Sequence, residues 1–281
     1  PAATSASITG LTATTQYYFT LIPFNWNGSQ PLTYNYRVAA TIPLANATTL
    51  VQPSTVSDII DDATFTYTSN IDYTLYQDNV MTNTSGNVAV WRFIIRDGGA
   101  TTDADALPTI LSSITFSSVA GIGNIRKAAL FDGNTLVSNV STINTGAGTI
   151  AFSGLSYSCP DNTTRTLSLR VSFNLSPIVD NEQLVFSIVN ADVSAATMST
   201  SSLFTTFSAI SSSTVGNRNR LVVSGTALAF VQQPTTFVQN SNMTPAPTVG
   251  SVDVNGNRDF DFVGTVSITS TGTLNTSPQT A

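Results

Sequence analysis

A strict alternation of apolar and polar residues most constrains how this chain can fold. Residues 166–176 read Thr-Leu-Ser-Leu-Arg-Val-Ser-Phe-Asn-Leu-Ser, so every second side chain from Leu167 to Leu175 is apolar. Successive side chains of a β-strand point to opposite faces, whereas a helix with this pattern would spread its apolar residues around its whole circumference. Shorter alternations surround five other positions: Phe116, Phe152, Phe186, Phe230 and Ile268.

Turn signals separate these alternating runs at short intervals. Asp132-Gly133 lies between two apolar stretches of residues 128–137, which predicts a hairpin with a two-residue turn. β-Branched residues are abundant, and no window longer than about ten residues keeps a helical period. The predicted fold class is therefore all-β, with tandem antiparallel β-sandwiches.

The composition excludes several classes of function. The 281 residues include no histidine, so the chain has no imidazole base for nucleophilic catalysis and no histidine ligand for a metal. The net charge of −6 and the single lysine, Lys127, argue against nucleic acid as a partner. The single cysteine, Cys159, allows no internal disulfide, and no apolar run approaches the ~20 residues of a membrane span.

Residues 1–45 carry the most specific local pattern. Leu11 precedes Tyr17 by six residues, Tyr17 opens an apolar alternation, and Gly28 follows eleven residues later. This pattern resembles the C-terminal half of a fibronectin type III domain, in which the leucine and the tyrosine form a tyrosine corner. Thr14 departs from the proline that the family often has nearby. The resemblance implies that the earlier strands of the domain lie outside this sequence.

Residues 225–281 resemble the opening of a bacterial Ig-like repeat. An Ala-Phe strand is followed by Gln-Gln-Pro, a proline-rich passage, Val-Asp-x-Asn-Gly-Asn and a further strand. The positions that match the repeat are Phe230, Pro234, Asp253, Gly256 and Asn257. Because both end modules are incomplete, we expect the chain to be a segment of a longer polypeptide.

Residues 46–224 show continuous strand signal without a clear linker. One large β-sandwich is the preferred interpretation, and two small Ig-like domains are the alternative. In composition and modules, the whole chain resembles a segment of a large multidomain bacterial surface adhesin or fibre protein, of the kind exported by type IX secretion. That resemblance implies an extracellular or cell-surface location.

The densest group of carboxylates suggests a calcium site. Asp97, Asp103 and Asp105 lie within the run Asp-Gly-Gly-Ala-Thr-Thr-Asp-Ala-Asp, directly after an apolar stretch. Carboxylate and carbonyl oxygens on such a loop are suitable ligands for calcium, although the spacing differs from that of an EF-hand. No other cofactor is predicted. Asp58, Asp61 and Asp62 form a second, weaker candidate cluster.

Aromatic residues between positions 67 and 91 suggest a ligand site. Tyr73 and Tyr76 lie near aspartate and asparagine side chains, and flat rings beside such groups are suited to binding sugars. Tyrosines of an all-β chain also serve as core edges and cross-strand pairs. A carbohydrate-binding module that recognises cell-surface glycans is therefore the alternative function.

The favoured function is a non-enzymatic structural or adhesive segment of a stalk or fibre. Its expected partners are other copies of the chain or neighbouring domains. A hydrolase that uses paired aspartates is a third hypothesis, but the sequence offers no pair whose environments differ in an identifiable way. Cys159 has no histidine to activate it and is expected to be idle or buried.

Overall fold

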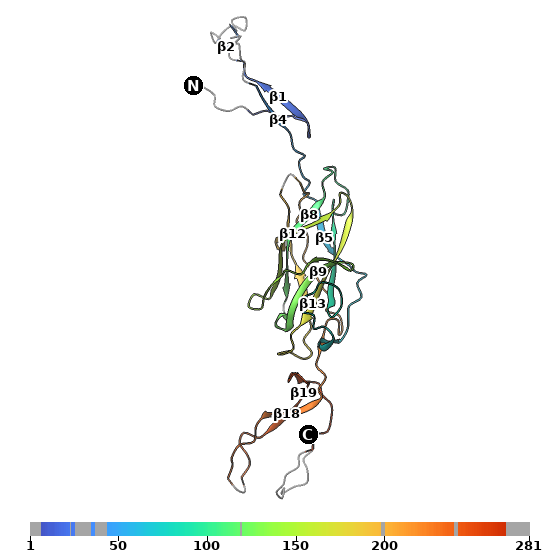
Figure 1. The fold of residues 1–281 in the computed structure, drawn as a ribbon, viewed down its shortest axis with the longest axis vertical. Coiled ribbons are helices and arrows are strands. Elements are labelled where there is room, and N and C mark those ends of the chain that lie inside the picture. Colours follow the sequence, from blue (N-terminus) through green and yellow to red (C-terminus); the bar gives the residue numbers. More distant parts are fainter. Residues whose placement is uncertain are drawn as a thin grey trace.

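The computed structural model describes residues 7–22, 24–25, 35–36, 44–118, 120–197, 200–238 and 241–267. Within these ranges the protein is all-β, as predicted, and the helical turns are short 3-10 turns: η2 (Tyr73–Leu75), η3 (Ile122–Asn124) and η4 (Asn190–Asp192). A helix long and apolar enough to cross a membrane is not found in the described part of the chain. Figure 1 shows three groups of strands that follow one another along the long axis.

The central group is a sandwich of two antiparallel sheets. The first sheet has the order β10 (Thr135–Ser138), β9 (Ile125–Asp132), β13 (Thr164–Phe173), β7 (Val88–Arg96) and β5 (Asp58–Asp61). The second has the order β11 (Thr142–Asn144), β12 (Thr149–Cys159), β8 (Thr109–Ser118), β14 (Phe186–Ile188) and β16 (Ile210–Ser211). β15 (Val193–Ala195) also pairs with β8.

One cluster of buried hydrophobic residues, running from Ile59 to Val223, fills the space between these sheets. Its centre is aromatic: the Trp91, Phe93 and Phe116 rings have centroids 5.7–6.0 Å apart, and Phe152 lies 6.1 Å from Phe116. These are favourable separations for tilted and edge-to-face rings. A shared core of this kind favours one large sandwich over two small domains.

The alternation of residues 166–176 becomes the central strand β13. Leu167, Leu169, Val171 and Phe173 are completely buried, as the pattern predicts. Leu175 is 55% exposed, because the strand ends at Phe173. The alternate residues of β13 point to the outer face of the five-stranded sheet.

The predicted hairpin is present between β9 and β10. Asp132 pairs with Thr135, so Gly133 and Asn134 form the two-residue turn. Gly133 has a φ of +56°, a conformation that glycine adopts without strain. Beside this hairpin, Met81 packs with Phe131 and Ala129 in a second, smaller apolar cluster.

The N-terminal group begins with β1 (Gln16–Thr20), which pairs with β4 (Leu44–Thr48) from Gln16 opposite Thr48 to Thr20 opposite Leu44. The pairing carries this unit past the predicted boundary at residue 45. β2 (Phe24–Asn25) pairs with β3 (Asn35–Tyr36). The Tyr17 hydroxyl accepts a 2.8 Å hydrogen bond from the Thr12 N–H. Gly28, the third position of the fibronectin resemblance, lies outside the described residues.

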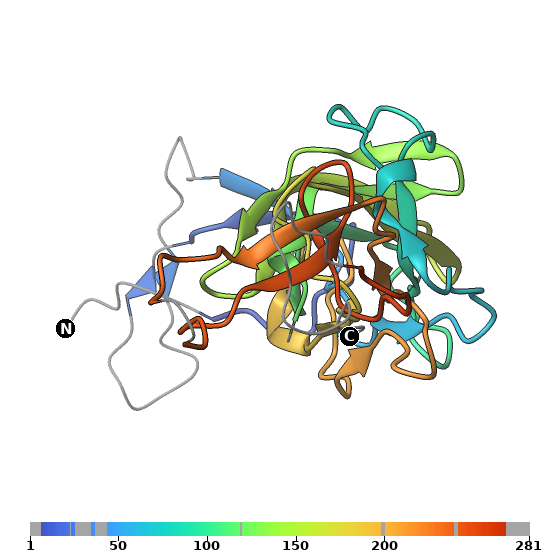
Figure 2. The same cartoon turned by 90° about the horizontal axis from the view of Figure 1, so that it is seen from below.

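The C-terminal group is a three-stranded sheet of β18 (Ala227–Gln232), β19 (Thr248–Val252) and β20 (Arg258–Asp259). In Figure 2, which views the molecule from below, these orange and red strands cross in front of the sandwich. The turn that joins β19 to β20 contains Asp253, Gly256 and Asn257, three of the positions that resemble the bacterial Ig-like repeat.

Short parallel bridges fix the chain where it enters and leaves the sandwich. At the N-terminal side, Ser57 bridges to Phe204 in parallel. At the C-terminal side, β17 (Leu221–Val222) runs parallel to β6 (Ile71–Asp72). Both segments are therefore part of the sandwich rather than of a free linker.

Candidate metal centre

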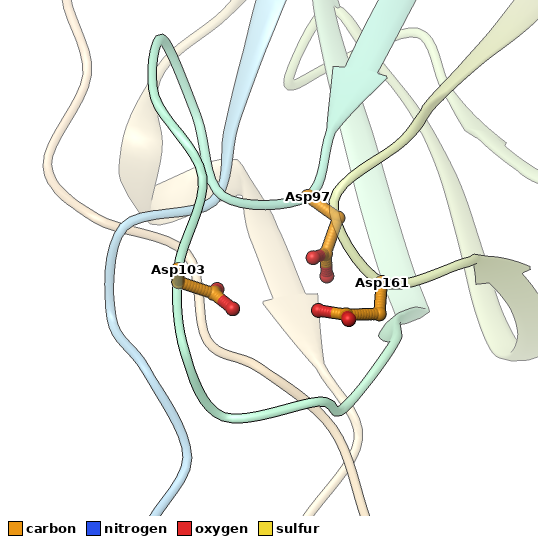
Figure 3. Close-up of side chains that lie close together, drawn as sticks. All are labelled: Asp97, Asp103 and Asp161. Carbon is orange, nitrogen blue, oxygen red and sulfur yellow. The ribbon is translucent and has the colours of Figure 1, made fainter.

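Three carboxylates from two different loops converge at one end of the sandwich. Asp97 directly follows β7, Asp103 lies on the loop between β7 and β8, and Asp161 lies in the turn between β12 and β13. One carboxylate oxygen from each residue lies within 4.8 Å of the other two. Figure 3 shows the three side chains pointing toward one another.

Asp97 is the buried member of this group, with 3% of its surface exposed. Its carboxylate accepts a 2.6 Å hydrogen bond from the Thr109 hydroxyl and a 2.8 Å bond from the Asn162 N–H. β7 and β13 are paired up to Arg96 and Thr164, and this pairing brings the two loops together. The position of Asp97 is therefore fixed by the sheet itself.

Asp103 is held through its backbone. Its N–H donates to the Asn162 side-chain oxygen at 2.7 Å, and its carbonyl accepts from the Asn162 side-chain nitrogen at 3.2 Å. The Oδ2 atom of Asp103 is buried and has no hydrogen-bond partner in the described part of the chain. A buried carboxylate oxygen without a partner is costly, so this atom favours a bound cation or proton.

The electrostatics of the group point in the same direction. Burial raises the pKa of Asp97, and the neighbouring carboxylates of Asp161 and Asp105 add to the rise. Burial also raises the pKa of Asp103, together with the charges of Asp105 and Asp97. A divalent cation would remove this repulsion. Calcium binds about six to eight oxygens, and the three carboxylates could supply part of that shell.

The structure corrects one member of the predicted triad. Asp105 is not among the carboxylates whose oxygens lie within 4.8 Å of one another. Its carboxylate accepts hydrogen bonds from Leu107 N–H at 2.8 Å, from the Ser202 hydroxyl at 2.9 Å and from Ser54 N–H. Sequence proximity therefore misassigned Asp105, whose carboxylate organises the loop instead.

Asp161 takes its place in the group. The sequence could place Asp161 there only if the pairing of β7 with β13 were known. In that pairing Thr164, at the start of β13, lies opposite Arg96, at the end of β7, so the turn before β13 meets the loop after β7.

The second predicted cluster is divided among three separate partners. Asp58 pairs with Arg96, Asp62 pairs with Arg92, and Asp61 accepts a 2.8 Å hydrogen bond from the Trp91 indole N–H. These carboxylates bind side chains of β7, so they serve the packing of the sandwich edge.

A further acidic group lies near the C-terminal sheet, where carboxylate oxygens of Asp180, Asp259 and Asp261 lie within 4.8 Å of one another. This group cannot be recognised in the sequence, because Asp180 is some 80 residues from the other two.

The structure also corrects the glycan role predicted for Tyr73. Only 1% of Tyr73 is exposed, and its hydroxyl lies within a buried hydrogen-bond network, so its ring offers no free face to a sugar. Tyr76 is half-buried and packs against the main core. Glycan binding by Tyr76 stays a prediction.

Cys159 is also buried. Its sulfur lies 3.4 Å from the Thr163 carbonyl oxygen and 3.6 Å from that of Ile95, and burial raises the pKa of the thiol. These surroundings disfavour the reactive thiolate.

The chain matches no family model, no curated protein and no solved structure with which it was compared. The residues and their geometry therefore carry the functional argument.

Proposed function

We propose that this chain is a non-enzymatic structural segment of an extracellular bacterial surface protein, in which tandem β-sandwich modules form a stalk or fibre. The observation that carries the proposal is a buried joint between the central sandwich and the C-terminal sheet. A stalk must transmit orientation from one module to the next, and a joint of satisfied buried polar groups does so better than a flexible linker.

Tyr73 is the centre of this joint. Its hydroxyl donates to the Asp253 carboxylate and accepts 2.7 Å hydrogen bonds from the side-chain nitrogens of Asn255 and Asn257. Tyr73 belongs to η2 of the sandwich, whereas the other three residues belong to the β19–β20 turn. The joint therefore connects groups about 180 residues apart in the sequence.

Asn257 extends the joint to a second segment of the sandwich. Its side-chain oxygen accepts from Ile178 N–H at 2.9 Å, and its side-chain nitrogen donates to the Leu175 carbonyl at 2.8 Å. Only 4% of Asn257 is exposed. Its amide thus satisfies the buried Ile178 N–H, which would otherwise have no partner, and also binds the Leu175 carbonyl.

Asp180 provides an independent contact across the same joint. Its carboxylate accepts 2.8 Å hydrogen bonds from Val223 N–H, at the end of the sandwich, and from Phe260 N–H, next to β20. Asp259 accepts a 2.8 Å bond from Gly225 N–H. Two sets of buried contacts therefore connect the sandwich to the C-terminal sheet.

The N-terminal unit supports the same proposal. The hydrogen bond from Thr12 N–H to the Tyr17 hydroxyl is the type of contact that defines a tyrosine corner. This contact favours the fibronectin type III resemblance of residues 1–45, and modules of that kind are suited to tandem arrays. The expected partners of the chain are neighbouring modules or further copies of itself.

Calcium binding by Asp97, Asp103 and Asp161 would complement this role. Gly98 and Gly99 belong to the same loop, and Gly99 packs against the carbonyl of Val56 in the segment that enters the sandwich from the N-terminal unit. A cation at this position would stiffen the N-terminal side of the sandwich.

The test of the proposal is electron microscopy of the native protein, combined with its intact mass. We expect extended rods or fibres in which the sandwich recurs with a constant orientation to its neighbour. A compact particle of 29.5 kDa would contradict the stalk proposal. The variant Asn257→Ala should keep the length of the particles but widen the distribution of angles between the sandwich and the C-terminal sheet.

A further inference from the structure

The outer face of the five-stranded sheet, which carries β9 and β13 in Figure 1, holds a hollow of about 720 Å³. Arg92 and Ile94 of β7 and Thr166, Ser168 and Arg170 of β13 form its floor. These residues alternate with buried core residues along both strands, so the sheet fixes their spacing. The volume lies within the usual range of ligand sites, about 300–1,000 Å³.

Two loops form the walls of this hollow. The segment from Asp62 to Phe65 lies on one side, and the β9–β10 turn with Asp132, Gly133 and Asn134 lies on the other. The first wall is rigid, since the Asp62 carboxylate accepts from Thr64 N–H at 3.0 Å and from the Thr64 hydroxyl at 2.7 Å.

A second hollow of about 380 Å³ adjoins the first and shares Asp62 and Phe65 with it. Residues 211–215 and Arg218 supply most of its opposite wall, including the hydroxyl-bearing residues Ser211, Ser213 and Thr214. Phe65 therefore stands between two hollows lined by hydroxyl groups, carboxylates and guanidinium groups.

Phe65 belongs to a row of aromatic and arginine side chains. Its ring centroid lies 4.6 Å from that of Tyr67 at an angle of 66°. The Arg92 guanidinium lies 5.5 Å from the Phe65 centroid, and the Arg218 guanidinium lies 5.4 Å from that of Tyr67. The Tyr67 hydroxyl accepts a 3.0 Å bond from Ser213 N–H. This row is held in place before any ligand binds, which reduces the entropy cost of binding.

The charges in the larger hollow balance. Its lining contains two arginines, Arg92 and Arg170, and two aspartates, Asp62 and Asp132, so its net charge is zero. Arg92 and Asp62 form an ion pair. A polyanion would require an excess of positive charge, which this surface lacks. Hydroxyl groups, by contrast, can donate to the carboxylates and accept from the guanidinium groups.

We propose that the two hollows form one binding site for a neutral oligosaccharide that crosses the ring of Phe65. Hydroxyl groups of successive sugars would bond to the polar side chains of each hollow, and an apolar sugar face would pack against Phe65. This site is separate from Tyr73 and Tyr76, and it does not depend on the stalk proposal.

The test is calorimetric titration of the full chain with neutral hexasaccharides of β-linked glucose, mannose and N-acetylglucosamine. We expect at least one probe to bind, and Phe65→Ala to weaken its binding by about tenfold or more, as for an aromatic anchor. The affinity should be the same at about 0.05 and 0.5 M NaCl, because a neutral ligand is not screened. The control Phe230→Ala alters an exposed ring of the C-terminal sheet and should leave binding unchanged.

A second variant protects the test against misfolding. Asn134→Arg places a bulky side chain at an exposed position of the wall and should block binding without loss of thermal stability. The proposal is overturned if none of the probes binds, or if binding survives both Phe65→Ala and Asn134→Arg. Binding restricted to sulfated glycans and abolished by salt would also overturn it, since the ligand would then be an anion.

Discussion

The two ends of the central sandwich are joined to their neighbours by opposite chemistry. At the C-terminal end, Tyr73, Asp253 and Asn257 satisfy one another in a buried network. At the N-terminal end, the incoming segment passes Gly99 beside a group of carboxylates that repel one another. The Tyr73 network is satisfied within the protein, although the neighbouring group of Asp180, Asp259 and Asp261 leaves Asp259 Oδ1 without a partner in the described part of the chain. At the N-terminal end, the buried carboxylates themselves have raised pKa values, so a cation there has the larger repulsion to neutralise.

We expect calcium to have the largest effect, and to stabilise the N-terminal end of the sandwich more than the C-terminal end. With a dissociation constant of ~0.1 mM, as in extracellular modules, 10 mM calcium would stabilise the folded chain by about 2.7 kcal/mol. For a chain of this size that corresponds to a rise in Tm of about 5–10 °C. Differential scanning calorimetry in the presence of calcium and in the presence of EDTA measures this rise in Tm. Hydrogen exchange should show the added protection around Asp97 rather than at the C-terminal joint.

Asp103→Asn provides the variant for that measurement and should abolish the calcium effect. Asp72→Asn is the matched control, because Asp72 is exposed and its bond to Thr74 N–H can be made by either side chain. An equal calcium effect in the wild type and in Asp103→Asn would rule out this site.

Removal of the Asn257 amide should loosen the C-terminal joint next most strongly. Asn257→Ala leaves the Ile178 N–H and the Leu175 carbonyl without their partner, at a cost of about 1–3 kcal/mol for each buried group that stays unsatisfied. Faster hydrogen exchange in β19 and β20 would report it. Asn255→Ala removes a single contact to Tyr73 and should have a smaller effect, so equal effects of the two variants would refute the role given to Asn257.

A substitution at Gly99 should disturb the N-terminal end. Gly99 has a φ of +65°, and a methyl group there would overlap the Val56 carbonyl oxygen. We expect Gly99→Ala to cost about 1–3 kcal/mol, from backbone strain together with displacement of the incoming segment. Gly154→Ala is the matched control, since Gly154 has a similar φ of +66° but open space around it. Chemical denaturation of both variants would separate strain from overlap.

Lowering the pH should destabilise the C-terminal joint and stabilise the N-terminal loop. This is the smallest effect that we expect. Burial opposes ionisation of Asp253, but its hydrogen bonds from Tyr73 and Asn257 outweigh burial and lower its pKa. Its contribution is therefore present above the ordinary pKa of about 3.9 and is lost as the pH falls through the lower folded value.

Asp97 and Asp103 have raised pKa values, so their stabilising contribution is present at low pH and is lost as the pH rises through the folded values. Hydrogen exchange without calcium, corrected for intrinsic rates, should therefore show the C-terminal joint weakening and the N-terminal loop tightening in acid. A shift of the same sign at both ends would contradict this assignment.

The sequence was most informative where structure is local. The period of two in residues 166–176 predicted which side chains of β13 are buried, and Asp132-Gly133 predicted the β9–β10 hairpin. Both patterns depend only on residues that are close in the sequence, so they can be interpreted without knowing how the strands pair. The boundary at residue 45 was less accurate, because β4 is recognised only through its pairing with β1.

The candidate sites were predicted less well because they are assembled from distant segments. Asp97 and Asp103 were identified from their spacing, but Asp161 joins them only through the pairing of β7 with β13. In the sequence, Tyr73 fitted both a ligand-binding role and a packing role, and its partner Asp253 lies 180 residues away. Local composition cannot distinguish a tyrosine that binds a ligand from one that closes a joint between modules.

The parallel bridges at the two ends of the sandwich have a mechanical consequence. Ser57 beside Phe204 and β17 beside β6 place the incoming and outgoing segments alongside neighbouring strands. Hydrogen bonds between strands lie across the strand direction, so tension along these segments shears them simultaneously instead of peeling them apart one by one. The two bridged segments should therefore make the sandwich resist tension that is applied through its ends.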